Sequence, residues 1–303
     1  MPQTVNQSVQ TTLLTGFSRA FKSPILSWYK IFPRLKVEDV KGMYEVADFS
    51  EARLVNDGFA DGDATAKTDF GWVYANYQVE NHGLRHPFTR QQREHDKRYE
   101  QRKMRAAKGL IQQVQNNTER KVVNIMTASA NNVATASNLD LSNVASSALY
   151  PALSLAMNTV RNATGVFPNT IAMNTSALMR ISQLAEYRDN SKYVVDLNAA
   201  GLPASMMNGK LEVVEFISAF DTAAKGLARS LSSAFGNFIW LGYVDRDSQM
   251  QGEVLTYGAT IFTDEYSREF YDDVTESNWL EYKFIHTPVP VAKECGYLIP
   301  ITL

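Results

Sequence analysis

The histidines of this sequence are the first places to search for metal chemistry. His82 and His86 lie four residues apart, which is the spacing of two metal ligands on one face of a helix. Gly83 and Pro87 disfavour a helix at this position, and no acidic or cysteine partner completes a ligand set. We therefore expect no metal site at these histidines.

Cys295 is the only cysteine of the chain, so no intrachain disulfide can form. A cysteine nucleophile needs a neighbouring base, and His286 is the only histidine close to it in sequence. Nothing around these two residues resembles a catalytic motif. The sequence therefore predicts that Cys295 is a small, buried, apolar side chain.

Motifs for common enzyme chemistry are absent from the sequence. It contains neither a GxxxxGK[ST] nor a GxGxxG loop for phosphate binding, and no GxSxG, HExxH or CxxC pattern. Asp61 and Asp63 form an acidic pair that could hold calcium only loosely, because no EF-hand pattern surrounds them. Asp272 and Asp273 are likewise expected to be solvated surface charge. The sequence thus predicts a protein that is not an enzyme and has no cofactor.

Composition limits the classes of protein that remain. The 303 residues are 45% hydrophobic and 20% charged, which allows a sizeable core, and the net charge is -2. A protein built to grip nucleic acid usually carries a basic surplus, so any contact with nucleic acid should be local or weak. No signal peptide and no apolar run of about 18 residues is visible, so we expect a cytosolic protein without a membrane span.

A long acidic hairpin is predicted over residues 36–82. Tyr44–Val55 and Phe70–Tyr77 have the residue types and the alternation of strands, and the stretch between them carries Gly, Asn and Asp turn signals. Acidic residues outnumber basic ones along it. Because an isolated two-stranded ribbon is only marginally stable in water, this hairpin needs a surface on which to lie.

A basic helical stretch follows over residues 88–128. Its first part, 89–108, is almost wholly polar and rich in Arg and Lys. Its second part carries a narrow apolar stripe that includes Ile111, Val114, Thr118 and Val122. We expect one long helix or two helices in line. The polar part is either solvated or lies against charged partners.

The remaining segments indicate an α+β protein. Tyr150–Thr164 is a predicted helix that ends at Gly165, and Ser176–Leu184 is another. Strands are expected near 170–174, 211–216, 238–244, 256–262, 279–286 and 297–303. Before the hairpin, an aromatic-rich arm with Phe17, Phe21 and Trp28 must pack on its own domain or reach a neighbour.

The order of these parts resembles that of the major capsid proteins of tailed bacteriophages, which have the Hong Kong 97-like fold that encapsulin shells also use. The resemblance extends over nearly the whole chain. Its best local matches are Val160–Asn174 (VRNATGVFPNTIAMN), Phe238–Val244 (FIWLGYV) and Gly258–Phe262 (GATIF). These are loose patterns rather than an invariant motif.

The resemblance implies an α+β, Hong Kong 97-like capsid fold with a defined division of the chain. Residues 1–35 would form the N-terminal arm and 36–82 the extended β-hairpin loop. Residues 83–149 would form the peripheral domain with its long spine helix. Residues 150–260 would form the axial domain, and 261–303 the C-terminal strands of the peripheral domain.

The resemblance also implies a function. Such subunits assemble with copies of themselves into hexamers and pentamers of an icosahedral virion head around double-stranded DNA, formed in the host cytoplasm. The packaged DNA would be contacted weakly and non-specifically, and no membrane would be involved. Only about 30 residues precede the fold, so a separate scaffolding protein is expected, together with a portal and a decoration protein as further partners.

A contact between subunits follows from the charges. The acidic hairpin of one copy is expected to lie on the basic helix of its neighbour, with aromatic residues as anchors. The residues expected at this contact are Phe70, Trp72 and Tyr74 as anchors, Asp57, Asp61 and Asp63 on the loop, and Arg93, Arg98, Arg102 and Arg105 on the helix. Some members of the family crosslink a loop lysine to a neighbour, and Lys67 is the candidate here.

Two other functions remain open from the sequence. An encapsulin-like compartment would have the same fold and would hold protein cargo in place of DNA. A nucleic-acid-binding protein would use the basic helix at 90–108, although the net charge of -2 opposes this.

Overall fold

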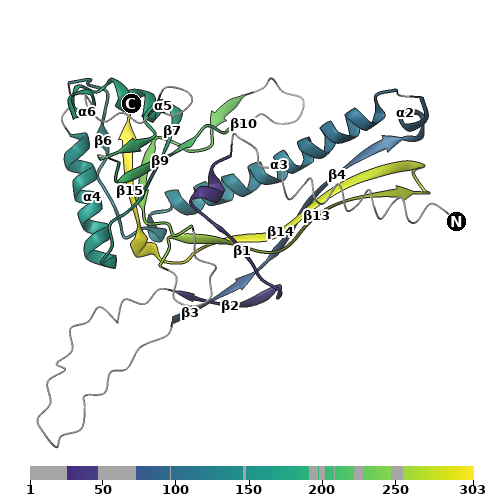
Figure 1. Cartoon of the computed structure of the whole chain (residues 1–303), viewed down its shortest axis with the longest axis horizontal. Helices are drawn as coiled ribbons and strands as arrows, with labels where there is room; N and C mark the ends of the chain where they lie inside the picture. The colour runs from purple at the N-terminus through teal and green to yellow at the C-terminus, as the bar shows by residue number, and fades with distance from the viewer. Residues whose placement is uncertain are drawn as a thin grey trace, which may run out of the picture.

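The computed structural model describes residues 26–46, 73–95, 97–145, 148–190, 197, 202–207, 209–221, 228, 230–246 and 255–303. Two sheets dominate this part of the chain, with one long helix between them (Figure 1). Short 3-10 turns lie at η1 (Trp28–Lys30), η3 (Ser129–Asn131) and η4 (Lys293–Cys295), and a small pair is formed by β10 (Ala219–Asp221) and β11 (Leu231–Ser233).

The first sheet is long and narrow. Its strand order is β1 (Arg34–Lys36), β13 (Gly258–Asp272), β14 (Ser277–Pro290) and β4 (Glu80–Thr89). β1 runs parallel to β13, and the other pairs are antiparallel. Pro87 is tolerated in β4 because β4 is an edge strand, where a missing N–H costs no ladder hydrogen bond.

The predicted basic stretch folds as two helices, α2 (Arg90–His95) and α3 (Tyr99–Thr127). The predicted stripe is confirmed, since Ile111, Val114, Thr118 and Val122 are all buried. For the polar part before residue 108, Lys103 fits the alternative of contact with a charged partner, since it is 5% exposed. Lys103 forms an ion pair with Glu269 of β13, so this part of α3 also packs on its own sheet.

The second sheet has the strand order β5 (Ala134–Thr135), β15 (Gly296–Thr302), β12 (Phe238–Gly242), β7 (Thr170–Asn174), β9 (Leu211–Phe216) and β8 (Ser205–Met206), and β6 (Leu139–Asp140) also pairs with β15. Helices α4 (Leu149–Thr164), α5 (Thr175–Gln183) and α6 (Ala185–Asn190) accompany it. Gly165 ends α4 with φ 77°, as predicted, and Asn174 caps α5 by accepting from the N–H of Ala177.

This second sheet separates two hydrophobic cores. Ala172, Trp240 and Leu298 face the core that contains the apolar side of α3. The neighbouring Ile171 and Ile239 face the core formed with α4 and α5. Because successive strand residues point to opposite faces, every position of β7 is buried. Burial on both faces explains why the middle of β7, Ile171–Met173, is apolar without a polar alternate.

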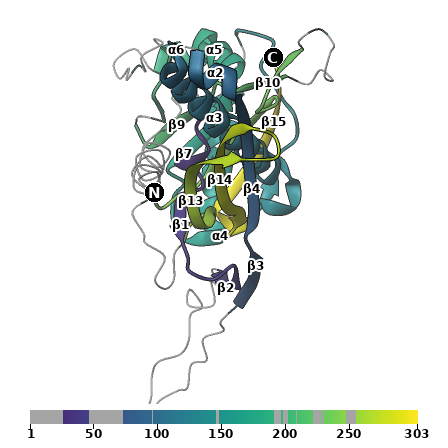
Figure 2. The ribbon, with the colours of Figure 1, turned by 90° about the vertical axis from the view of Figure 1, so that its right-hand side faces the viewer.

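The predicted hairpin is confirmed at its root. β2 (Lys41–Val46) pairs antiparallel with β3 (Val73–Gln78), with Lys41 opposite Gln78 and Val46 opposite Val73. The pair projects from the end of the first sheet, below the rest of the molecule in Figures 1 and 2. Residues 47–72, which comprise the outer parts of the two predicted strands and the predicted loop between them, lie outside the described residues.

The predicted domain boundaries stay a prediction. The strand pairing adds one fact that bears on them. Gly296–Thr302 belongs to the sheet built mainly from residues 150–260, whereas Gly258–Pro290 supplies the long hairpin of the other sheet. Among the described residues, no helix is both long enough and apolar enough to cross a membrane.

Candidate intersubunit surface

The root of the hairpin has two unlike faces. Residues directly opposite in an antiparallel pair share a face, so Tyr44 and Ala75 lie on one side and Met43 and Asn76 on the other. The first side faces the body of the molecule, where the Tyr44 hydroxyl donates to the Pro290 carbonyl at 3.0 Å. Burial raises the pKa of Tyr44, which fits a ring held against the body.

The second side of the root is exposed and partly apolar. Met43 is 70% exposed and Tyr74 is 57% exposed, and they are diagonal neighbours across the two strands. Tyr74 is one of the predicted anchors, and its intersubunit role stays a prediction. Met43 was missed by the sequence analysis, although its alternation with the inward-facing Tyr44 was a usable signal.

The other residues predicted on the loop cannot be placed. They lie outside the described residues and comprise Asp57, Asp61, Asp63, Phe70, Trp72 and the crosslink candidate Lys67. Their roles stay predictions.

The four predicted arginines lie on the basic helices, and all are exposed. Arg93 belongs to α2, Arg98 precedes α3, and Arg102 and Arg105 lie within α3. The spacing of the last three places them on one side of the helical path. The structure therefore brings Arg98, Arg102 and Arg105 together. A surface that binds acidic side chains of a partner needs such a cluster.

A pocket opens beside these arginines, between the edge strand β4 and helix α3. It holds about 300 Å³ and is lined by His86, Phe88, Gln92, Tyr99, Arg102, Arg105 and Ala106. Phe88 and Tyr99 meet edge to face, with ring centroids 5.5 Å apart. The lining thus combines two aromatic rings with two arginines.

The chain entering the fold is anchored on its own molecule. Trp28 and Phe32 are buried, and Arg34 lies over the rings of both Trp28 and Phe284. This confirms packing of the arm on its own domain for residues 26–35, whereas residues 1–25 lie outside the described part.

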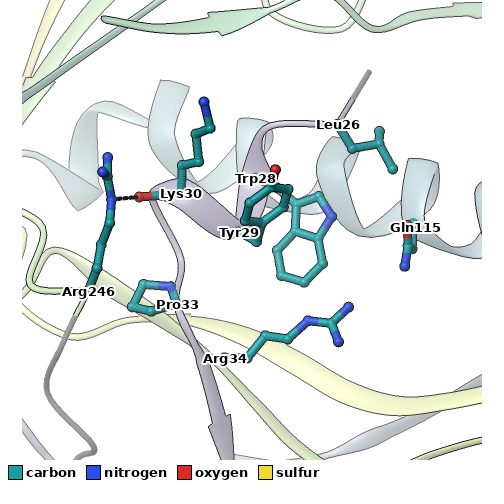
Figure 3. A pocket seen from close by; sticks show the side chains of 8 residues that line it. All are labelled: Leu26, Trp28, Tyr29, Lys30, Pro33, Arg34, Gln115 and Arg246. Atoms are coloured by element: carbon teal, nitrogen blue, oxygen red, sulfur yellow. Dashed lines mark hydrogen bonds between the residues drawn. The ribbon is translucent and has the colours of Figure 1, made fainter. Parts of the chain in front are cut away.

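A pocket of about 280 Å³ lies beside this anchor (Figure 3). Its wall combines residues 26–34 with Gln115 of α3 and with Arg246, whose Nε donates to the Lys30 carbonyl at 2.9 Å. This contact ties the entering chain to the segment that follows β12.

A buried carboxylate lies beneath the same segment. Glu119 of α3 is 0% exposed and accepts hydrogen bonds from the Ser27 N–H and the Ser218 hydroxyl. Burial raises its pKa to about 7, and the hydrogen bonds act in the opposite direction. Glu119 therefore joins three segments that are distant in sequence.

The two histidines that prompted the metal search lie on strand β4 rather than on a helix. His82 contacts His286, with ring centroids 4.8 Å apart, and the Lys121 ammonium lies 3.0 Å from its Nε2. His86 instead packs against Phe88. Within the described part of the chain, no three His, Cys, Asp or Glu side chains are arranged to hold a metal ion.

The predicted burial of Cys295 is confirmed, since it is 0% exposed. Burial raises the pKa of its thiol to about 12, which leaves it protonated and unreactive at neutral pH. The other candidate, His286, is engaged by Thr118 at 2.8 Å and by the Phe284 carbonyl at 3.1 Å. Within the described part of the chain, no hydrogen bond joins the Cys295 thiol to His286.

Comparison with known proteins finds similar structures but no similar sequences. No protein-family model matches the chain, and no curated protein matches it in sequence. A phage-related protein from Bordetella bronchiseptica RB50 is similar in structure with a TM-score of 0.72 and 17% identity, covering 95% of this chain and 96% of that one.

Two further solved structures extend the similarity. The capsid structure of the cyanophage P-SCSP1u matches with a TM-score of 0.64 and 8% identity, over 93% of this chain and 90% of the other. A virus-like particle from Pyrococcus furiosus matches with a TM-score of 0.55 and 10% identity, over 97% and 99%. The predicted fold is confirmed, and the chain has the Hong Kong 97-like fold of phage capsid proteins.

Proposed function

We propose that this chain is a major capsid protein that assembles into the hexamers and pentamers of an icosahedral head enclosing double-stranded DNA. The observation that carries the proposal is a capsid fold shared over nearly the full length of the chain, with 93% covered by the cyanophage capsid. A fold alone does not imply a function, so surfaces of this particular chain must support the assignment.

The hairpin root supplies such a surface. It projects from the body, and its outer face exposes Met43 and Tyr74 among polar side chains. Burial of apolar area gives about 25 cal/mol per Å², so these side chains gain stability only against a partner. A neighbouring copy provides that partner in every position of a shell.

The basic helices supply the second surface. One side of the helical path carries Arg98, Arg102 and Arg105. Their positive charge is complementary to the negative charge of the acidic segment at 47–72. Each exposed ion pair contributes only about 0–1 kcal/mol. The charges therefore set orientation and partner choice, while the apolar contacts supply most of the affinity. Weak contacts that recur many times also allow misplaced subunits to leave a growing shell.

The proposal includes the predicted partners. A separate scaffolding protein, a portal and a decoration protein would complete the head, and DNA inside it would be contacted weakly because the chain has a net charge of -2. The domain division into 1–35, 36–82, 83–149, 150–260 and 261–303 is part of the same proposal. Assembly would take place in the host cytoplasm.

Electron microscopy of the purified full-length protein tests the assembly. Closed particles of uniform diameter, with six-fold and five-fold clusters, are the expected result. A protein that stays monomeric, or that forms only irregular aggregates under every assembly condition, would refute the proposal.

The contents of particles from the native source separate the two kinds of shell. Double-stranded DNA that survives nuclease until the particle is opened indicates a virus head. A folded protein cargo without DNA indicates an encapsulin-like compartment. The similarity to the Pyrococcus furiosus virus-like particle, at a TM-score of 0.55, does not favour this alternative over a virus head, because the cyanophage capsid matches at 0.64.

A further inference from the structure

The turn between strands β13 and β14 presents an apolar side chain to solvent. Val274 is 92% exposed, and the preceding Tyr271 is 43% exposed. Two strands of 15 and 14 residues carry this turn to the end of the first sheet. A single exposed apolar residue is ordinary on a protein surface. Val274 therefore indicates a binding surface only if neighbouring features support one.

Side-chain hydrogen bonds hold this turn in one shape. The Asp272 carboxylate accepts from the Val274 N–H at 3.1 Å and from the Thr275 hydroxyl at 2.9 Å. The Trp279 indole donates to the same hydroxyl at 3.3 Å, and Arg85 lies over its ring. A turn that is already ordered loses little conformational entropy when it docks.

The arginine-lined pocket lies at the same end of the molecule, which faces the viewer in Figure 2. Strand pairing fixes this arrangement, because Ser277 after the turn is opposite Thr89, which immediately precedes α2. The pocket volume of about 300 Å³ lies at the lower end of the range for ligand pockets. It can admit one branched side chain with part of its turn.

The charges of the two features are complementary. Asp273 and Glu276 flank Val274 and are exposed, while Arg102 and Arg105 line the pocket together with the Phe88 and Tyr99 rings. An apolar tip with acidic neighbours thus corresponds to a pocket that combines aromatic rings with arginines.

We propose that the turn at 272–276 of one copy docks into the pocket between β4 and α3 of a second copy. Val274 enters against Phe88 and Tyr99, and its acidic neighbours meet Arg102 and Arg105. Because tip and pocket are different surfaces, the contact is head-to-tail, and repeated contacts of this kind form a ring where the rotation from copy to copy returns to the first copy. The inference rests on the proposed function, since it names one contact of the shell. It narrows the loop contact proposed above, because Arg102 and Arg105 meet the turn and only Arg93 and Arg98 remain for the acidic loop.

Cysteine crosslinking between two single variants tests the contact. Val274→Cys and Ala106→Cys chains are prepared separately, mixed in equal amounts, assembled and mildly oxidised. The native Cys295 is 0% exposed and gives little background. Roughly a quarter of the contacts in such a mixture join a variant tip to a variant pocket when the ring closes at random. A disulfide-linked dimer band, absent from either variant alone, is the expected result.

The controls make each outcome decisive. Val274→Cys mixed with Leu155→Cys, an exposed residue of α4, should give no dimer. A dimer from Val274→Cys alone would show that the tips meet each other, and this would overturn the inference. A dimer of Ala106→Cys with Asp61→Cys, but not with Val274→Cys, would assign the pocket to the acidic loop and would also overturn it.

The same experiment separates this inference from the proposed function. Closed particles without a tip-to-pocket dimer would leave the shell function standing and the docking refuted. Failure of the wild-type protein to form particles would refute both. As a second measure, Asp273→Arg and Arg105→Asp should each reduce the particle yield, and the two exchanged charges together should restore it.

Discussion

The backbone N–H of Ser27 donates to the Glu119 carboxylate at 3.1 Å, across 92 residues of sequence. The Ser218 hydroxyl donates to the same carboxylate from the segment after β9. A buried carboxylate held by neutral donors keeps its charge only at a cost, which is why its pKa is raised to about 7. We therefore expect this group to make the docking of the entering chain depend on pH.

Glu119 is expected to make the subunit less stable as the pH rises from about 4.5 to 7. In that range the unfolded carboxyl has lost its proton while the folded one keeps it, so each pH unit removes about 1.4 kcal/mol. The contribution is present in full below pH 4.5 and is lost above about 7, for a total on the order of a few kcal/mol. Urea unfolding of dissociated subunits at one protein concentration measures it.

Glu119→Gln is the matched variant, because the amide is neutral, accepts from Ser27 and can donate to Ser218. The informative quantity is the wild-type stability minus that of Glu119→Gln, plotted against pH. This difference should fall between pH 4.5 and 7 and then stay level. A level difference over the whole range would show that Glu119 is not the responsible group.

His286 is expected to act in the opposite direction. The pKa of its imidazole is lowered from 6.5 to about 3, mainly by burial, with smaller contributions from His82 and from the positive charges of Lys121 and Arg34; the hydrogen bond to the Phe284 carbonyl acts in the opposite direction. Between pH 6.5 and about 3, the imidazole is protonated in the unfolded chain and neutral in the folded one. Stability from this residue is therefore present above pH 6.5 and is lost as the pH falls toward 3.

His286→Phe removes the titration and keeps an aromatic ring over Phe284, with which the imidazole is stacked at 4.0 Å. Thr118 retains the Val114 carbonyl as a hydrogen-bond acceptor. Loss of the imidazole contacts lowers stability by the same amount at every pH. The variant should therefore lose less stability than wild type between pH 6.5 and 3, and an equal acid loss would contradict the assignment.

Gly258 is expected to tolerate no side chain. A Cβ at this position would lie 2.4 Å from the buried Phe32 ring, which fixes the entering chain against β13. Gly258→Ala should cost about 1–3 kcal/mol through displacement of that ring. Gly109→Ala is the control, since nothing lies within 4 Å of its Cβ, and it should stabilise α3 by about 0.5–1 kcal/mol. Equal effects of both variants would contradict this explanation.

Elements with a strong local pattern could be predicted from the sequence. The helix expected at Tyr150–Thr164 runs over Leu149–Thr164, and the strand expected at 211–216 is Leu211–Phe216. The helix has a regular apolar period and Gly165 marks its end, while the strand is a short segment rich in strand-forming residues. The hairpin root was predictable for the same reason. The capsid fold followed from the order of these elements.

Elements stabilised by distant partners could not be predicted in the same way. β13 extends to Asp272, well beyond the predicted end at 262, because Glu265 is buried there by Arg34 and by the Tyr282 hydroxyl. A charged residue such as Glu265 argues against a buried strand in the sequence, because the partners that neutralise it, Arg34 and Tyr282, are distant in the chain. The strand at Glu80–Thr89 was missed because Gly83 and Pro87 oppose it, and only its edge position explains the proline.

The candidate site was predictable in part for a related reason. Charge patterning identified Arg98, Arg102 and Arg105, because a basic run is visible in the sequence. The pocket beside them was not visible, since Phe88 and Tyr99 meet only when β4 packs on α3. Val274 gave no signal, because its exposure depends on the hairpin around it.

Reversal of the arginine charges tests the whole surface. Arg98, Arg102 and Arg105 changed together to Glu should lower the yield of closed particles roughly tenfold or more, because like charges across an interface cost several kcal/mol and each 1.4 kcal/mol is a factor of ten. All three side chains are exposed, so the subunit should still fold. Particle counts by electron microscopy measure the yield, and circular dichroism checks the fold.

A single reversal on the same helix provides the matched control. Arg120 is exposed on α3 but lies four turns beyond the arginines that line the pocket. Arg105→Glu should therefore reduce the particle yield more than Arg120→Glu, although both change the net charge equally. Added salt should also slow wild-type assembly by screening the same charges. Wild-type yield and geometry from the triple reversal would show that assembly depends on the apolar contacts without charge complementarity.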